Sequence, residues 1–417
     1  MRVQLTSITL GLLALSGGAM AQDAGSMFSF SGFGTLAAVR TSTDDAIYVT
    51  NFQKHGATKS ASTEPDSKLG GQVNAKLNDT FSGTLQLLAK QDAVGEYGPA
   101  VEWAFLKAKV NGNLDVRAGR IGAPVFMTSD YRNVGYTNLS MRTPPDVYRA
   151  VPVSSFDGAD VLYQHSVGNT TFNAQLYVGK ASTKTNDTTT FLLKDMKGFN
   201  LTAENGAFTY RAGYIQTTLG AEGAGVSGLA TLQGGLRSIG GLAPGLGSLT
   251  TLADDIGIDG KKASFAGVGI AYDSGNWVGS AELTKRKSDS LYVSDLSGWY
   301  TTLGYRVGKV TPYVSLSGNN TDSLTSFTAP STVGYPALVQ GTVPVLVANV
   351  NGGVLNNYTE KTLAFGARWD AGKGYAVKGE IARVSIPADS TGWFTGATRS
   401  ATDTNINVLS VGVDFVF

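Results

Sequence analysis

The chain has 417 residues, with 33 Lys and Arg against 32 Asp and Glu, and it contains no Cys. A net charge of +1 excludes the large basic excess that marks nucleic-acid-binding proteins. The lack of Cys excludes disulfides, thiolate chemistry and Cys-ligated metals. The length fits either two or three soluble domains or one closed barrel.

The N-terminal region predicts export. Arg2 gives a positive start, a mostly apolar stretch runs from Leu5 to Leu15, and Ala19-Met20-Ala21 has the form of a cleavage site. These features predict a signal peptide over residues 1–21, although a buried soluble helix could have a similar pattern. No run of about 18 apolar residues follows, so no transmembrane helix is expected.

Polar and apolar residues alternate with a period of two along most of the chain. Apolar or small residues alternate with polar ones from Leu69 to Leu77, and the same alternation resumes from Phe81 to Ala89 after a tight turn at Asn78-Asp79-Thr80. Such alternation predicts a β-hairpin with one apolar and one polar face.

Short turns alternate with longer connections along the chain. This order predicts an all-β fold, in which residues 22–417 form a single antiparallel transmembrane barrel of 16 strands with short periplasmic turns and long extracellular loops. The expected strands are 28–40, 67–77, 81–90, 101–110, 114–120, 157–165, 170–179, 197–204, 207–217, 263–272, 277–286, 297–306, 310–318, 359–370, 375–384 and 405–417.

Aromatic residues distinguish a membrane barrel from a soluble sandwich, which also alternates. They stand on the apolar face beside the short turns, where a barrel gathers them into a belt at the membrane interface. The opposite face is too polar to pack a dry core. The chain is therefore expected in the cell outer membrane, in contact with its lipid. The aromatic set is Phe81, Tyr163, Phe172, Phe208, Tyr272, Trp277, Tyr305, Trp369 and Tyr375.

The last strand alternates up to the terminal residue, Phe417. A terminal aromatic residue after an alternating strand resembles the signal read by the outer-membrane barrel assembly machinery, which is thus an expected partner during biogenesis. Closure of the barrel removes the edge strands that would otherwise template aggregation.

Several short segments carry a resemblance to a known family. They are Trp103-Ala104-Phe105-Leu106-Lys107-Ala108-Lys109, Val116-Arg117-Ala118-Gly119-Arg120, Gly308-Lys309-Val310-Thr311-Pro312-Tyr313-Val314, and the hairpin from Leu363 to Lys378. With these segments the chain resembles the trimeric general porins of Gram-negative bacteria, especially of β-proteobacteria, over essentially the whole mature chain. The resemblance implies a homotrimer, a water-filled channel, and a third long loop that folds into the barrel and faces an Arg cluster on its wall.

The segment that corresponds to this third loop covers about residues 120–156. Four prolines stiffen it, and it lacks the acidic Pro-Glu-Phe-Gly-Gly type of signature that is common in the family, which argues against cation preference. A surface loop with ordinary solvated charges is the alternative. The candidate residues for the pore constriction and the lumen charge are Lys107, Lys109, Arg117, Arg120, Asp130, Arg132, Arg142, Asp146, Arg149 and Arg211.

The polar face predicts a surplus of cations in the lumen. A barrel of 16 strands is wide enough for an aqueous channel, and lumen charge sets its selectivity. We expect the surplus to act most strongly around Lys107, Lys109 and Arg117, beside the third loop, and to cause a weak to moderate anion preference. The alternative is that these charges only keep the lumen wet. The expected wall cations are Lys76, Lys90, Lys107, Lys109, Arg117, Arg211, Arg286, Arg306, Arg368 and Lys378, and the anions are Asp115, Asp160, Glu204, Glu282, Asp370, Glu380 and Asp414.

Two long connections, 219–262 and 319–357, are unusually apolar for loops that face water. They are expected to pack on each other as a lid, to enter the lumen or to contact a neighbouring subunit. The loop 41–66 is polar and is expected at the surface.

The predicted function is passive diffusion of small hydrophilic solutes and ions, and the alternative is an adhesin or binding protein that uses its apolar loops. An enzyme is not expected, because His55 and His165 are far apart and neither lies in a Gly-x-Ser-x-Gly setting. No sequence motif indicates a cofactor, a metal or nucleic acid.

Overall fold

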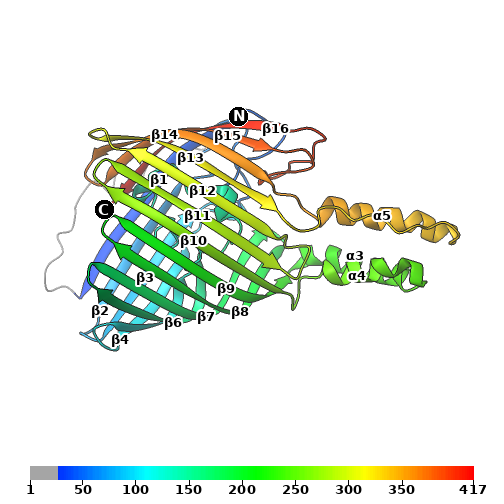
Figure 1. Cartoon of the computed structure of the whole chain (residues 1–417), viewed down its shortest axis with the longest axis horizontal. Coiled ribbons are helices and arrows are strands. Elements are labelled where there is room, and N and C mark those ends of the chain that lie inside the picture. Colours follow the sequence, from blue (N-terminus) through cyan, green and yellow to red (C-terminus); the bar gives the residue numbers. More distant parts are fainter. Residues whose placement is uncertain (1–26) are drawn as a thin grey trace.

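The computed structural model describes residues 27–417, so the predicted signal peptide over residues 1–21 lies outside the described residues. Within that range 16 strands form one closed antiparallel barrel, in which each strand pairs with its neighbours in sequence and β1 pairs with β16 (Figure 1). The strands are β1 (Phe28–Thr41), β2 (Lys68–Lys76), β3 (Phe81–Lys90), β4 (Ala100–Lys109), β5 (Leu114–Gly122), β6 (Ser155–Val167), β7 (Thr170–Asn186), β8 (Thr189–Asn205), β9 (Phe208–Glu222), β10 (Lys262–Ser274), β11 (Trp277–Ser288), β12 (Leu296–Tyr305), β13 (Val310–Thr321), β14 (Glu360–Gly372), β15 (Tyr375–Ile386) and β16 (Thr404–Val416).

The predicted all-β fold with 16 antiparallel strands is confirmed. The largest difference is in β7 and β8, which extend through much of the segment 180–196 that was expected to be a loop. Register shifts between Gly179 and Ala181, and between Lys194 and Lys197, interrupt the period of two in these strands. An extra residue in one strand moves the following side chains to the other face, and this hides the continuation of the strand from a search for alternation.

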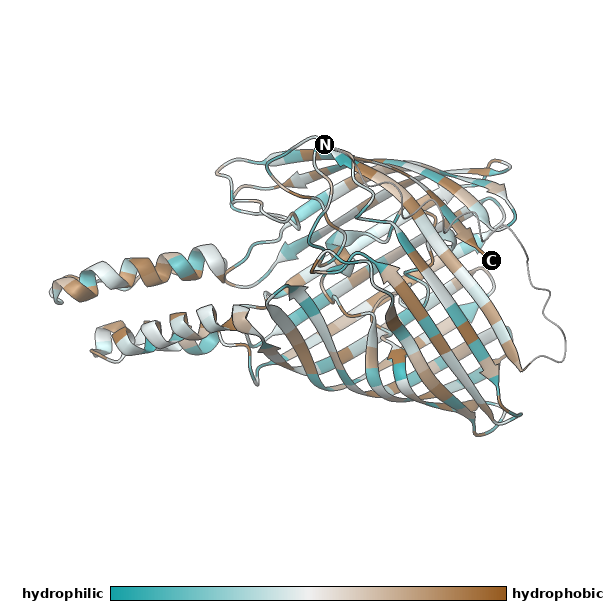
Figure 2. Cartoon of the chain, turned by 180° about the vertical axis from the view of Figure 1, so that it is seen from behind, coloured by the Kyte–Doolittle hydropathy of each residue, from teal (hydrophilic) through white to brown (hydrophobic). Residues whose placement is uncertain are grey.

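The outer surface of the barrel is apolar. Large side chains of the apolar phase are exposed, among them Leu106, Leu283 and Phe365, and Figure 2 shows hydrophobic residues interspersed with hydrophilic ones along the strands. Aromatic residues lie beside the short turns, where the Trp277 and Tyr305 rings are 4.8 Å apart. Within the described residues, no helix is long and apolar enough to cross a membrane.

The C-terminal residue takes part in closing the barrel. The backbones of Gly32 in β1 and Phe417 exchange two hydrogen bonds of 2.8 and 3.0 Å. The Phe417 ring lies directly over Gly32, where a Cβ atom would come within 2.2 Å of the ring. A residue without a side chain is therefore needed at position 32 for this seam to close.

The two long apolar connections form helices instead of open loops. Residues 223–261 contain η2 (Ala224–Val226), α3 (Ser227–Gly240), η3 (Pro244–Leu246) and α4 (Gly247–Asp255), and residues 322–359 contain α5 (Ala337–Gly353). These helices share one apolar core, which includes Leu236, Leu249, Ile256, Val343 and Val350. The connections therefore pack on each other, as the first expected arrangement had it, but they project from one end of the barrel as a helical extension instead of forming a lid (Figure 1).

Candidate functional site: the barrel interior

The connection between β5 and β6, residues 123–154, is called the inner loop below. It contains η1 (Gly135–Thr137) and α2 (Pro145–Tyr148). Although it begins and ends on neighbouring strands, its middle binds to the far side of the barrel. The Lys378 ammonium of β15 donates hydrogen bonds to the carbonyl oxygens of Gly135 at 2.8 Å, Asn138 at 2.6 Å and Ser140 at 3.0 Å. The Arg368 guanidinium of β14 also donates to the carbonyl of Asn138 at 3.1 Å.

The start and end of the inner loop bind to a second part of the wall. Arg211 of β9 donates to the carbonyl oxygens of Pro124 and Val125, and Glu282 of β11 accepts the backbone N–H of Met127 at 2.9 Å. Arg286 of β11 donates to the carbonyl of Ala150 at 2.8 Å. The loop is thus fixed at many points, and each wall cation satisfies a carbonyl that has no partner in a β-ladder.

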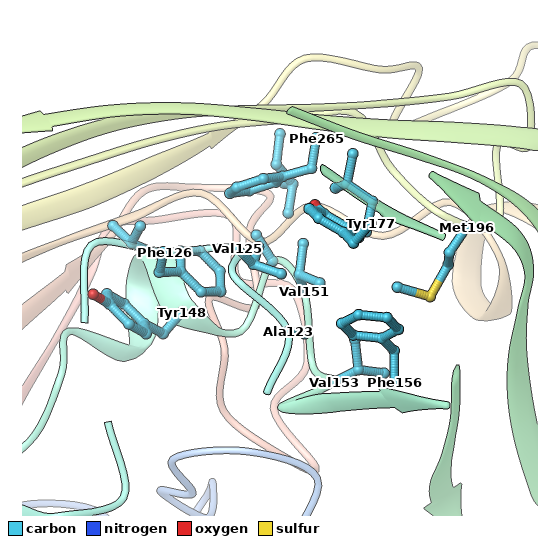
Figure 3. Close-up of a cluster of buried hydrophobic side chains, with 14 of the residues drawn as sticks. Ala123, Val125, Phe126, Tyr148, Val151, Val153, Phe156, Tyr177, Met196 and Phe265 are labelled. Atoms are coloured by element: carbon cyan, nitrogen blue, oxygen red, sulfur yellow. The ribbon is translucent and has the colours of Figure 1, made fainter. Parts of the chain in front are cut away.

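Apolar side chains of the inner loop pack on the strand wall between these polar contacts. The Phe126 and Tyr148 rings stack with centroids 4.3 Å apart, and Phe126 meets Phe265 of β10 edge-on at 5.1 Å (Figure 3). The same core includes Val151 from the loop and Tyr177 from β7. One side of the barrel interior is therefore occupied largely by a packed apolar core.

Arg142 is the most strongly held charge of the inner loop. Its guanidinium binds Asp66 at 2.6 Å and Glu380 at 3.2 Å, and all three side chains are at most 8% exposed. Burial lowers the pKa of the Arg142 guanidinium, but Asp66, Tyr48 and Glu380 outweigh burial and raise this pKa well above its usual value. Arg142 is therefore a permanently charged tether between the loop and the wall.

Asp66 belongs to the connection 42–67, which was expected to lie only at the surface. That expectation was wrong, because Asp66, Tyr48 and Ala57 are buried, and Tyr48 and Ala57 pack against β14, β15 and β16. The polar composition of this connection gave no sign of burial, since its few apolar residues are spread thinly along the sequence.

Asp146 and Asp130 of the inner loop have different environments. Asp146 is 2% exposed and accepts hydrogen bonds from Ser317 of β13 and from Thr362 of β14. Asp130 is exposed on the side of the loop that faces the open passage described below.

The structure changes the interpretation of the predicted wall charges. Many of the expected lumen cations are bound to a carboxylate or to the inner loop. Ion pairs join Arg117 to Asp160, Lys107 to Asp115, Arg211 to Glu282, Arg368 to Asp370 and Lys378 to Asp414. A solute in the lumen therefore does not meet the full surplus of positive charge that is counted along the wall, because carboxylates neutralise part of it.

The structure also places two of the expected constriction residues, Arg120 and Lys109, away from the constriction. Arg120 lies on the outward face of β5, in the same phase as Ala118, and pairs with Asp157 at 2.7 Å on the outside of β6. Strand β5 continues to Gly122, so Arg120 belongs to the strand and alternates with the lumen side chains. Lys109 lies at the end of β4, beside the short turn, and therefore far along the strand from the inner loop.

An open passage remains between the inner loop and strands β2 to β4. It consists of two cavities of about 320 and 300 Å³ that share Glu102 and Asn133. Asn133 donates a hydrogen bond of 3.1 Å to Glu102, so this pair marks the neck between the two cavities. The first cavity opens toward the long loops, and the second reaches Phe417 near the closing seam.

Basic residues dominate the first cavity. Lys68 of β2 and Lys90 of β3 stand directly opposite each other in the strand register, and Arg132 of the inner loop joins them. The basic lining residues are Lys68, Lys90, Arg132, Arg142 and Lys184, and the acidic ones are Asp66, Asp92 and Glu102. The sequence prediction included Lys90, Arg132 and Arg142, but it missed Lys68 and Glu102. Alternation did not assign Glu102 to the lumen, because a register shift between β3 and β4 near Gln86 and Leu87 interrupts the period of two in β4.

The arrangement is similar to solved structures of outer-membrane proteins. Salmonella typhi OmpF, solved in complex with daunomycin, matches at a TM-score of 0.55 with 14% identity, over 94% of this chain and 97% of that one. An anion-selective porin from Comamonas acidovorans matches at 0.53 with 13% identity, over 94% and 99% of the two chains. The trimer form of OmpT, an outer membrane protein of Vibrio cholerae, matches at 0.50 with 11% identity, over 94% and 100%.

The chain has the fold of an outer-membrane porin. The predicted resemblance is thus confirmed at the level of the fold, and a closed barrel with an apolar exterior is the architecture of an outer-membrane protein. No protein-family model matches the sequence, and no curated protein matches it either.

Proposed function

We propose that this protein is an outer-membrane pore for passive diffusion of small hydrophilic solutes and ions, with a weak to moderate preference for anions. One observation carries the proposal. Two adjoining cavities lie beside the inner loop inside a barrel with a largely apolar outer surface, and Glu102 and Asn133 line both of them. A polar lumen inside a lipid-facing barrel can conduct water and ions.

The anion preference rests on Lys68, Lys90 and Arg132 above the neck. The two lysines stand opposite each other on β2 and β3, so their positive electrostatic potentials add near them. Glu102 opposes them at the neck itself, which limits the preference to a moderate one. The structural similarity to a porin described as anion-selective agrees with this sign.

Further parts of the proposal concern assembly. We propose a homotrimer in outer-membrane lipid, because a similar barrel is known in a trimer form and because the outer wall is apolar. Export by the signal peptide over residues 1–21 and insertion by the barrel assembly machinery belong to the same proposal. A pore of this kind needs no cofactor and catalyses no reaction.

The test is single-channel recording of the purified protein in a planar bilayer, first in symmetric salt and then in a salt gradient. Stepwise conductance with a reversal potential that favours anions is the expected result. Clear cation selectivity would contradict the anion preference, and insertion without conductance would contradict the pore.

A second function is favoured by the helical extension. No charged residue occurs between Asp322 and Glu360, and α5 exposes Leu338 and Val345 to solvent, at 75% and 59%. An exposed neutral helix suits a binding protein or adhesin better than a simple pore. Removal of residues 323–356 would abolish adhesion and leave conductance unchanged if both functions coexist.

A further inference from the structure

A third cavity of about 330 Å³ lies inside the barrel, on the other side of the inner loop from the passage neck. It shares Phe52, Pro152 and Thr183 with the first cavity of the passage, so a solute in the passage meets its entrance. The volume is in the range of small-molecule binding sites. This space is called the side cavity below.

The wall of the side cavity is mainly aromatic and aliphatic. Its aromatic residues come from separate strands and connections and include Phe191, Phe265, Tyr292, Tyr358 and Trp393. Tyr358 and Trp393 stack with their centroids 4.1 Å apart and their planes at 10°, and Phe191 and Tyr292 are 5.9 Å apart. Flat rings held in this way offer a stacking surface to a ring of a ligand.

Two guanidinium groups are the only charges in this wall, as far as the described residues show. Arg286 donates to the carbonyl of Ala150, the residue next to Arg149, so both guanidiniums lie near one short backbone segment. Arg286 also donates to the carbonyl of Ser294. Arg149 donates to the carbonyls of Val49 and Trp393, and it lies 4.9 Å above the Trp393 ring.

Neither guanidinium has a carboxylate within 4 Å among residues 27–417, in contrast to Arg117, Arg142 and Arg211. Burial lowers the pKa of the Arg149 guanidinium, and Glu360 and Asp146, which lie beyond Trp393, compensate only part of this effect. Both arginines are half-buried, and a half-buried cation without a close counter-charge favours an anionic group in the cavity.

A third polar group in the wall also lacks a partner. Trp393 is 9% exposed, and its indole N–H has no hydrogen-bond acceptor in the described part of the chain, although its backbone N–H binds Glu360 at 2.9 Å. An unpaired buried N–H costs about 1–3 kcal/mol, which an oxygen acceptor on a ligand would recover. The side cavity therefore combines ring-stacking surfaces and two cations, and Trp393, which carries the unpaired N–H, also lines a second cavity of about 40 Å³.

We propose that the side cavity binds aromatic monocarboxylates, and that the pore is selective for this substrate class. The inference rests on the proposed pore function, because the cavity opens from the passage. One carboxylate would lie against Arg149 and Arg286, and the ring would lie among the aromatic residues. A second charge at the other end of the ligand would be desolvated by the apolar wall, which excludes dicarboxylates.

The experiment measures block of single-channel current by 3-phenylpropanoate in symmetric salt. Propanoate lacks the ring and 3-phenylpropan-1-ol lacks the charge, so each tests one half of the site. We expect 3-phenylpropanoate to interrupt the current at a concentration at least about tenfold lower than either compound, because propanoate loses the ring contacts and 3-phenylpropan-1-ol loses the charge-assisted hydrogen bonds, which are about twice as strong as neutral ones. Equal block by all three compounds would overturn the proposal.

Variants of the residues that line the side cavity test whether the block of the current arises there. Arg286→Gln removes one cation, and Trp393→Phe removes the indole N–H but keeps a ring in the stack. We expect Arg286→Gln to weaken the block about tenfold and Trp393→Phe to weaken it severalfold. Arg237→Gln in the helical extension removes an exposed arginine and serves as the matched control with unchanged block. Unchanged block in both site variants, with normal conductance steps, would overturn the assignment.

Failure of the pore and failure of the site can be told apart. If the protein does not conduct, quenching of tryptophan fluorescence by 3-phenylpropanoate in detergent still measures binding, and the quench should be smaller in Trp393→Phe. Binding without conductance would support the site and contradict the pore. Conductance without block or quench would support the pore and contradict the site.

Discussion

Arg142 of the inner loop and Asp66 of the connection 42–67 form a buried ion pair of 2.6 Å inside the barrel. The two residues come from different connections, and Glu380 and Ser410 of the wall bind the same guanidinium. One side chain therefore joins two connections and two strands, and it determines how far the inner loop can move.

The first prediction concerns this tether. Arg142→Met leaves Asp66 and Glu380 buried without their cation, so we expect a loss of about 3–5 kcal/mol of local stability and a looser inner loop. Single-channel records should show larger current noise and a higher mean conductance. Asp66→Asn should have a smaller effect, because Glu380 and Ser410 still hold the guanidinium. Quiet channels of normal size in Arg142→Met would show that the loop is held by other contacts.

The second prediction concerns Lys378, whose side chain is fully buried and pairs with Asp414 at 2.9 Å. Lys378→Met should leave Asp414 without a counter-charge and remove one hydrogen-bond donor from each of three inner-loop carbonyls. We expect destabilisation of about 3–5 kcal/mol, measured by urea unfolding of the barrel in lipid vesicles. The control is Lys109→Met at the exposed end of β4, for which the change should stay within about 0.5 kcal/mol. Equal stability of the two variants would contradict the structural role of Lys378.

The fold was predictable because a transmembrane strand shows its alternation locally. Every expected strand is present, and boundaries differ most where a register shift interrupts the alternation, as at Gly179 and Lys194. The inner loop's partners were not predictable in the same way. Lys378 and Gly135 are 243 positions apart, and only the closed barrel brings them together.

The candidate site was predictable only in part. Alternation assigned Lys378, Arg211 and Arg368 to the interior, but it could not show that they bind loop carbonyls and not solutes. Arg120 was included among the constriction residues although it lies in the expected strand 114–120, where alternation from Arg117 places it on the outward face. Trp393 and Tyr358 lie in connections without any pattern, so no sequence signal indicated the aromatic wall of the side cavity.

The third prediction concerns ion selectivity at the neck. Lys90→Gln should move the reversal potential toward cations, and Glu102→Gln should move it further toward anions. A unit charge about 6 Å from the ion path contributes ~0.7 kcal/mol in water, which is about a threefold change in the permeability ratio. Lys109→Gln removes the same charge but lines neither cavity of the passage, so its effect should be small. Shifts of the same sign for Lys90→Gln and Glu102→Gln would contradict the assigned neck.

The fourth prediction concerns salt. The Debye length falls from about 10 Å at 0.1 M to about 3 Å at 1 M ionic strength. Lys68, Lys90 and Arg132 line an open cavity, so mobile ions can screen them. The anion preference should therefore decline toward unity when reversal potentials are measured in gradients at high salt. A preference that stays constant from 0.1 to 1 M would indicate selection by size or by a dry contact.

The fifth prediction concerns the helical extension as a unit that is separate from the pore. Val343 of α5 is fully buried among α3, α4 and α5, while Val345 on the same helix is 59% exposed. Val343→Asp places a charge without a partner in this small core, which should separate the helices, since burying an unpaired carboxylate costs several kcal/mol.

Limited proteolysis of the protein in vesicles measures the effect. Val343→Asp should expose residues 223–261 and 322–359 to cleavage at a much lower protease concentration, whereas the barrel should stay intact. Val345→Asp adds the same charge to the solvent side, and the protease should cleave it at the same concentration as the wild type. Conductance should be unchanged in both, because the buried core of the extension and the residues lining the passage are different sets. Loss of conductance in Val343→Asp alone would show that the extension supports the pore.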